Sequence, residues 1–419
     1  MASIRLPAIF CSHCKSWSRS LSLFSVLMKK KSQHPESEPR PVNHLDRLTS
    51  PLAGICFALF LVGGIATTSY AVISQNLNLF PKEISWSTFL NGDVSSGISK
   101  SLANAPFPDN AAKFERGFSW IVARDLGPRV REGKNDWLFL NDELVIHPNR
   151  LSNSDLRAKE IIDVEHQLAS QGIELLVVLV PDKSRIEHEF LGSQHRATVF
   201  TTRVADFEKK LSLNKINVIN LTDGLNQAKQ DGGTPFLRTD THWNEQGAEV
   251  AAKAVAQKVQ LFKFTPSPAQ ITRITSEANE TRPGDLVKLA GIDWLPKSLQ
   301  PMPEAAKIST FKSMPMSSGK TPIAANDLFG DNNLPNIALI GTSFSRTSQF
   351  IPYLEMQLNT QIGNFALDGG DFSGAARAYF NSPAFKSTPP KLLIWEIPER
   401  VIEMDRTNDM KILQGSAPT

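Results

Sequence analysis

The 419-residue sequence predicts an α/β protein with a mostly parallel sheet, preceded by one N-terminal transmembrane helix. Two observations predict this class. Helical and strand patterns alternate along the body of the chain, which favours a parallel sheet covered by helices on both faces. A stretch near the N-terminus, residues 53–73, contains no Asp, Glu, Lys or Arg and is mostly apolar.

The apolar stretch is long enough to cross a bilayer. As a helix rising about 1.5 Å per residue it would span roughly 30 Å, the thickness of a hydrocarbon core. The alternative is a cleaved signal peptide, but the stretch is longer than a typical signal and begins well inside the chain. We predict an uncleaved anchor at residues 52–73.

Charge predicts the topology of this anchor. The net charge of the whole chain is +3, yet the first fifty residues carry +5 and the remainder −2. Basic residues before a span favour a cytoplasmic N-terminus. We therefore predict a single-pass inner-membrane protein whose C-terminal body is periplasmic. The balanced charge of the body gives no electrostatic signal for nucleic acid.

The three cysteines, Cys11, Cys14 and Cys56, precede the anchor or lie inside it, so the body has no thiols for a disulfide framework. Cys11 and Cys14 have the spacing of half a zinc site, but no second pair accompanies them. The sequence predicts neither a metal nor a cofactor.

The predicted elements of the body are placed by hydrophobic period. Apolar residues at helical spacing predict helices, and short continuous runs of β-branched residues predict strands buried on both faces. The predicted helices are residues 153–171, 204–211 and 245–259, and the predicted strands are residues 137–140, 173–180, 216–221, 337–340 and 392–397.

These elements give a domain organisation. Residues 1–51 form a basic cytoplasmic segment, 74–130 a tether with peripheral helices, 131–402 the globular body and 403–419 a tail. Within the body, residues 265–335 are rich in Pro, Ser, Asn and Lys with little periodicity, which predicts a loop-rich insertion.

Asp240-Thr241-His242 comes just before the predicted helix 245–259. In an extended segment, residues two apart point to the same side, so the carboxylate can orient the imidazole. Alone the pair is a weak signal, because Asp-x-His also occurs in metal sites and in ordinary structural contacts.

Gly341-Thr342-Ser343 directly follows the predicted strand 337–340. A tight glycine turn between strand and helix presents a hydroxyl at the carboxyl edge of a parallel sheet, and nearby backbone N–H groups can face an oxyanion. The alternative is a serine- and threonine-rich helix cap with only a structural role.

Together the two motifs supply what serine acyl chemistry needs: a nucleophile, a base and a group that orients the base. The hypothesis is a Ser343–His242–Asp240 triad whose side chains converge within hydrogen-bond reach.

At this point the chain resembles a known family. Residues 133–140, 181–185, 240–244, 341–345 and 395–400, in this order, are similar to motifs of the AlgJ/AlgX-type alginate O-acetyltransferases. Their SGNH-hydrolase-like domain places Asp-x-His before the serine, the reverse of ordinary SGNH order, and this chain has the same order. The chain ends soon after Arg400, which favours the shorter AlgJ-like layout.

The resemblance implies an SGNH-like sandwich in which Ser343 is the nucleophile, His242 the base and Asp240 its orienting carboxylate. It implies acetylation of exopolysaccharide hydroxyls through an acetyl-serine, with a polysaccharide acceptor and a membrane-bound O-acyltransferase as acetyl donor. An acetyl esterase with the same triad and a non-catalytic polysaccharide-binding scaffold remain as alternatives.

Four further residues are candidates for binding the acceptor. Trp243 fits either the core or a sugar-stacking platform. Lys183, Arg185 and Arg400 lie at predicted strand ends, where they would bind an anionic sugar or form structural ion pairs; the structural role is favoured. For the oxyanion, the sequence offers the Ser343 N–H first, with Asn364 and residues 369–370 as weaker candidates.

Overall fold

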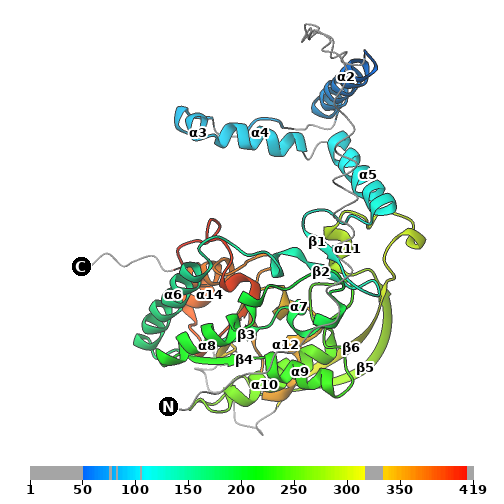
Figure 1. Ribbon diagram of the computed structural model, residues 1–419. Helices are drawn as coiled ribbons and strands as arrows, with labels where there is room; N and C mark the ends of the chain where they lie inside the picture. Colours follow the sequence, from blue (N-terminus) through cyan, green and yellow to red (C-terminus); the bar gives the residue numbers. More distant parts are fainter. Residues whose placement is uncertain (1–50, 75–77, 82–83, 104–105, 317–333, 413–419) are drawn as a thin grey trace, which may run out of the picture. The chain divides into compact units, whose positions relative to one another are not determined.

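The computed structural model describes residues 51–74, 78–81, 84–103, 106–316 and 334–412 (Figure 1). The predicted basic segment, the Cys11–Cys14 pair and the end of the predicted tail lie outside these residues. The chain divides into two units, residues 1–70 and 71–419. The helix α2 (Pro51–Ser74) contains residues 54–74, which are apolar and long enough to cross a membrane by length and composition.

Three helices follow α2: α3 (Trp86–Leu90), α4 (Asp93–Ala103) and α5 (Pro106–Ala123). Large apolar side chains on α3 and α5 are exposed, among them Trp86 and Phe118. The other face of α5 is held by the body, since Trp120 is buried and its indole N–H donates to the Leu299 carbonyl at 2.7 Å. Peripheral helices are therefore present within the stretch predicted as a tether.

The centre of the body is a five-stranded parallel sheet in the order β4-β3-β9-β7-β8. Its strands are β3 (Glu174–Val180), β4 (Asn217–Asn220), β7 (Ile337–Ile340), β8 (Gly363–Asn364) and β9 (Leu392–Pro398). All seven residues of β9 and all four of β7 are buried, as the continuous apolar runs predict. The predicted mostly parallel sheet is confirmed.

Helices cover both faces of this sheet (Figure 1). Successive strand side chains alternate between faces. Leu176 and Val178 therefore pack with α9, α10 and α12, whereas Leu175 and Val177 pack with α6, α8 and α13. The helix bounds in the body are α6 (Arg150–Ser170), α7 (Lys183–Ile186), α8 (Arg203–Leu213), α9 (Thr222–Gln230), α10 (Glu245–Val259), α11 (Asp285–Leu289), α12 (Phe350–Leu358), α13 (Gly374–Asn381) and α14 (Pro383–Ser387).

Two predicted segments have a pairing that the sequence did not specify. The strand predicted at residues 137–140 is present as the buried β2 (Leu138–Leu140), which pairs with β1 (Val130–Glu132) in an antiparallel hairpin outside the central sheet. The insertion expected to be loops contains a long antiparallel ribbon of β5 (Gln270–Arg282) and β6 (Glu304–Pro315). Most of β5 is exposed on both faces, so no alternation of apolar and polar residues marks it as a strand.

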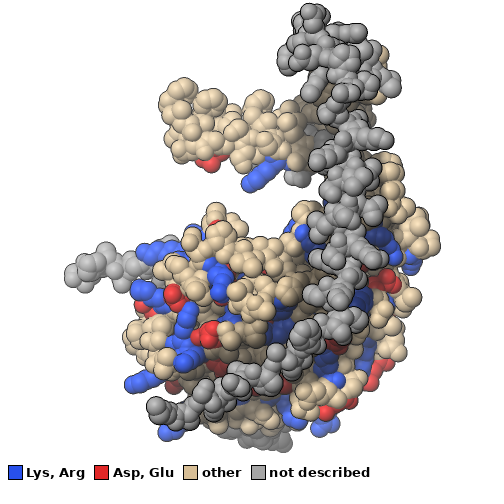
Figure 2. Space-filling model, viewed as in Figure 1, with Lys and Arg blue, Asp and Glu red and all other residues tan. Residues whose placement is uncertain are grey.

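Charge on the body does not form a field of one sign in the view of Figure 2, where acidic and basic side chains both occur across the face. On this face, the distribution agrees with the near balance of charge expected from the sequence.

Candidate active site

Asp240, His242 and Ser343 meet at the carboxyl end of the sheet. Ser343 is the first residue of the short 3-10 helix η6 (Ser343–Arg346), three residues after β7 ends, and His242 lies just before α10. The His242 Nε2 is 2.7 Å from the Ser343 Oγ, and its Nδ1 is 2.7 Å from the Asp240 Oδ1. The expected convergence is therefore present, with both contacts at hydrogen-bond length.

Asp240 and His242 meet through a turn, not through the extended segment that the sequence suggested. The Asp240 Oδ1 accepts the backbone N–H of His242 at 3.0 Å as well as the Nδ1 hydrogen. An aspartate that accepts the N–H two residues on makes a local turn of its own. The side chain of Asp240 therefore fixes both the backbone and the ring of His242.

These contacts decide where the protons lie. A carboxylate only accepts, so Asp240 favours the tautomer with hydrogen on Nδ1 and leaves the Nε2 lone pair facing Ser343. Burial alone would raise the pKa of Asp240, but the hydrogen bond and the charge of His242 lower it below its ordinary value. Asp240 is thus ionised and ready to stabilise a protonated imidazole.

The turn that carries Ser343 is fixed by a buried glutamate on β9. The Glu396 carboxylate accepts the Thr342 N–H at 2.6 Å, the Thr342 hydroxyl at 3.0 Å and the Ser345 hydroxyl at 3.1 Å. A Cβ on Gly341 would lie 2.5 Å from the Glu396 Oε2, so glycine is needed for this approach. Burial raises the pKa of Glu396, while the hydrogen bonds from Thr342 and Ser345 oppose that shift.

Lys183 holds the backbone of residues 238–242 in place through hydrogen bonds. Its side chain is fully buried, and the ammonium donates to the carbonyls of Leu138, Arg238 and Asp240 at 2.6, 2.8 and 2.9 Å. Burial lowers the pKa of Lys183 to about 8. With three protein acceptors and no exposed surface, Lys183 has the structural position that the sequence analysis favoured over substrate binding.

Trp243 is also part of the core. It is fully buried, and its indole packs edge-on against Phe344 with ring centroids 5.0 Å apart. A sugar-stacking platform must be exposed, so of the two alternatives for Trp243 its burial favours the core. The ring of Phe344 also contacts His242, which places this aromatic cluster directly beneath the triad.

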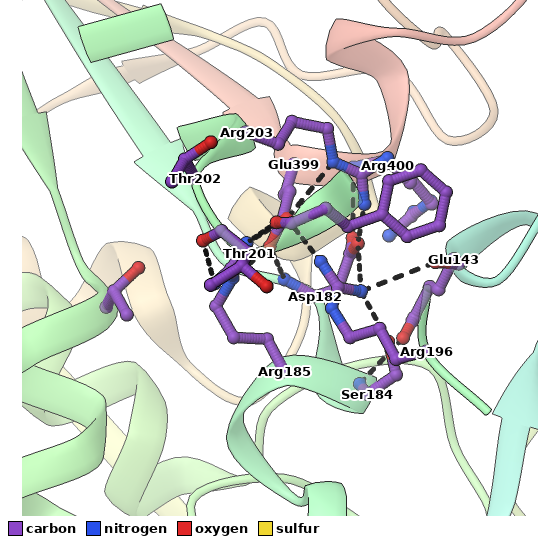
Figure 3. A network of polar contacts seen from close by, with 12 residues as sticks. Glu143, Asp182, Ser184, Arg185, Arg196, Thr201, Thr202, Arg203, Glu399 and Arg400 are labelled. Atoms are coloured by element: carbon purple, nitrogen blue, oxygen red, sulfur yellow. Dashed lines mark hydrogen bonds and ion pairs between the residues drawn. The ribbon is translucent and has the colours of Figure 1, made fainter. Parts of the chain in front are cut away.

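Arg185 belongs to a buried network of ion pairs at the ends of β3 and β9 (Figure 3). Its guanidinium donates to both oxygens of Glu399, at 2.7 and 2.6 Å. Arg203 bridges Glu399 to Asp182, and Arg196 contacts the same two carboxylates. Although burial opposes it, the arginines lower the pKa of Glu399 to about 2. Arg185 is thus committed to a structural ion pair.

Arg400 lies beside this network, and its side chain has fewer polar contacts than that of Arg185. Its backbone N–H donates to Asp182 at 2.9 Å, and its guanidinium carbon lies 5.5 Å from the centroid of the Phe344 ring. The Arg400 Nη1 is buried and has no hydrogen-bond partner among the described residues. A role for Arg400 in binding substrate stays a prediction.

Asp285 is a site residue that sequence analysis missed. It opens α11, between the strands of the ribbon, and its Oδ2 lies 3.6 Å from the His242 Nδ1. Asp240, His242 and Asp285 offer ligand atoms within 4.8 Å of one another, as a metal site would. Both nitrogens of the His242 ring are already engaged by Asp240 and Ser343, so this geometry favours acid–base chemistry.

The weaker oxyanion candidates have other contacts. The Asn364 amide donates to the Ser345 carbonyl at 3.3 Å and accepts the Ala366 N–H at 3.0 Å, while the Gly370 N–H donates to the Leu367 carbonyl. Within the described residues, the Ser343 N–H has no acceptor. The Ser343 N–H therefore stays the first candidate donor for an oxyanion, and the contacts above do not exclude the Gly369 N–H.

Comparison with known proteins identifies the family. The family model for the SGNH hydrolase-like domain of the acetyltransferase AlgX matches residues 130–399, which is most of the body. The chain belongs to this family.

Curated relatives and a solved structure agree with this membership. A probable alginate O-acetylase AlgJ of Pseudomonas aeruginosa is 33% identical over 282 residues, covering 66% of this chain and 71% of the relative. The AlgJ of Pseudomonas putida is 31% identical over 324 residues, covering 76% of this chain and 82% of the relative. The solved O-acetyltransferase domain of Pseudomonas putida AlgJ matches with a TM-score of 0.55 and 29% identity, over 66% of this chain and 93% of that domain. The predicted SGNH-like fold and the resemblance to AlgJ and AlgX are confirmed.

Proposed function

We propose that this chain is an O-acetyltransferase that acetylates hydroxyls of an alginate-type polysaccharide through an acetyl-Ser343 intermediate. The observation that carries the proposal is the pair of 2.7 Å contacts linking Asp240, His242 and Ser343. Family membership supports the class of reaction, and the names of the relatives support alginate as the acceptor.

In the first half-reaction, the Ser343 Oγ attacks the carbonyl carbon of the acetyl donor while the His242 Nε2 takes the hydroxyl proton. Asp240 stabilises the imidazolium that forms. The negative oxygen of the tetrahedral intermediate faces the Ser343 N–H. The bond to the donor's leaving group then breaks, His242 returns the proton to that group, and acetyl remains on Ser343.

In the second half-reaction, a sugar hydroxyl enters in place of the departed group. His242 accepts the proton of the hydroxyl, whose oxygen attacks the acetyl-Ser343 carbonyl. The intermediate collapses, His242 returns the proton to the Ser343 Oγ, and the acetylated sugar leaves. If water entered instead, the same steps would hydrolyse the ester, so transfer requires that the acceptor exclude water.

A hollow lined partly by residues close to the triad in the chain carries three cations and one carboxylate, that of Glu245. It has a volume of ≈ 220 Å³ and is lined by Arg282, Lys307 and Arg346 together with residues that follow His242 and Ser343 in the chain. Arg346 lies three residues after Ser343 on η6, and residues three apart on a 3-10 helix lie on the same side. Lys307 and Arg346 already pair with Glu277 and Asp368, and uronate carboxylates would compete for these cations.

The proposed location follows from α2. An apolar helix whose flanking N-terminal segment is basic would anchor the chain in the inner membrane with the body in the periplasm. Acetyl would then come from a membrane-bound O-acyltransferase, which is the partner implied by the resemblance to AlgJ and AlgX.

The proposal is tested by replacing Ser343 with Ala at the chromosome of the producing organism and measuring the acetyl content of its exopolysaccharide. A transferase predicts polymer that is still made but carries less acetyl. Higher acetyl content would mean an esterase, and unchanged content would support a non-catalytic scaffold; either result would overturn the proposal.

A further inference from the structure

We propose that Asp285 is a positioning residue whose carboxylate acts on His242 together with Asp240, so that two negative charges stabilise the protonated imidazole. This inference rests on the proposed function, because a stabilised imidazolium matters only if His242 is the base. It concerns a residue of the ribbon insertion, outside the motifs that carry the family resemblance.

Asp285 is tied to the Asp240–His242 turn by reciprocal hydrogen bonds. The Asp285 backbone N–H donates to the Asp240 Oδ2 at 3.0 Å, and the Asp285 Oδ1 accepts the Thr241 N–H at 2.6 Å. Asp240 thus accepts from His242 with its Oδ1 and from the Asp285 backbone with its Oδ2. The two carboxylates are held as a unit around the imidazole.

The approach of this segment depends on a glycine. The Gly284 N–H donates to the Thr239 hydroxyl at 3.1 Å, and a Cβ on Gly284 would lie 2.1 Å from the Thr239 carbonyl oxygen. Leu286, two residues after Gly284, donates its N–H to the same carbonyl. Since no larger residue fits at Gly284, the backbone brings Asp285 to a fixed place beside His242.

The Oδ2 of Asp285 is the oxygen that faces His242. It lies 3.6 Å from the His242 Nδ1, whereas the Oδ1 accepts the Thr241 N–H. At that distance a negative charge attracts an imidazolium whether or not a hydrogen bond forms. The side chain of Asp285 is 43% exposed, so solvent weakens this attraction relative to that of the buried Asp240.

Other charged groups face the same turn. Lys183 donates to the Asp240 carbonyl. Glu304, the first residue of β6, accepts the Thr239 N–H. Lys183 brings a positive charge and Glu304 a negative one to this turn. Neither group contacts the His242 ring, whereas Asp240 and Asp285 both lie within 4 Å of its Nδ1.

The test compares Asp285→Asn with wild type by following the His242 ring in an NMR pH titration of the full chain in detergent micelles. The asparagine keeps the shape and can still accept the Thr241 N–H, so only the charge is removed. Loss of one signal in His242→Gln assigns the resonance. Asp293→Asn is the matched control, because Asp293 is an exposed aspartate of the same insertion.

Removal of this charge should move the midpoint of the His242 NMR titration to lower pH. The acidic limb of kcat/KM for an activated acetyl ester should move down by the same amount, because that limb reports the free enzyme. The control variant should leave both unchanged. A His242 pKa in Asp285→Asn equal to that of wild type would overturn the inference.

This outcome is independent of the proposed function. If Ser343→Ala left polysaccharide acetylation unchanged, the function would fail, yet the NMR titration would still report whether Asp285 acts on His242. If instead Asp285→Ala destabilised the fold while Asp285→Asn left the His242 pKa unchanged, Asp285 would be only a structural brace, and the inference would be wrong.

Discussion

Replacing Glu396 with Leu should loosen the turn that carries Ser343. Leucine fills similar volume but accepts no hydrogen bonds, so the Thr342 N–H and the hydroxyls of Thr342 and Ser345 lose their acceptor. Each buried unpaired group costs about 1–3 kcal/mol, and hydroxyls can rotate toward other acceptors while a backbone N–H cannot. We therefore expect a loss of about 3–5 kcal/mol in the free energy of unfolding.

The matched control is Glu396→Gln. Its amide oxygen can still accept the Thr342 N–H, and burial already favours the neutral form of Glu396, so the expected loss is about 1 kcal/mol or less. Urea-induced unfolding of the full chain in detergent, followed by tryptophan fluorescence, measures both variants. Equal unfolding free energies for the Leu and Gln variants would refute the claim that this carboxylate holds the turn.

Two further predictions concern the buried carboxylate of Glu143 and the membrane topology of the chain. Burial raises the pKa of Glu143 from 4.5 to about 7, so its neutral form is favoured on folding and its contribution to stability is lost as pH rises through that interval. Glu143→Gln should therefore raise stability at about pH 8 by at most about 3 kcal/mol and change it little at about pH 4, measured by thermal unfolding; an equal effect at both would contradict the linkage. Alkaline phosphatase fused after Phe80 should be active in the periplasm, and an inactive fusion that is stably expressed would reverse the proposed topology.

The sequence predicted the features that depend on local pattern. The continuous apolar run at residues 337–340 gave the bounds of β7, and the helix at residues 245–259 coincides with α10. Ser343 and the Asp240–His242 pair were identifiable because each adjoins one of these elements. The side chains come together because the carboxyl end of β7 and the start of α10 lie at the same edge of the sheet.

The rest depended on contacts between distant segments. Lys183 lies at a predicted strand end, where the sequence allowed either a contact with sugar or a structural ion pair. Its three carbonyl acceptors come from residues 138, 238 and 240, and no local pattern reveals such burial. The sequence around Trp243 is compatible with both the core and a binding surface, and only its contact with the distant Phe344 distinguishes them. Asp285 was missed because it lies in an insertion whose exposed ribbon lacks the alternation that marks a strand.

The most direct test of the account is to locate the acetyl group on the enzyme. Brief reaction of the full chain with an activated acetyl ester, followed by acid quench and peptide mass spectrometry, should find acetyl on Ser343 and none at that peptide in Ser343→Ala. Ser345 is the internal control, because its buried hydroxyl donates to Glu396 and not to His242. Acetyl on Ser345, or continued turnover by Ser343→Ala, would contradict the proposed mechanism.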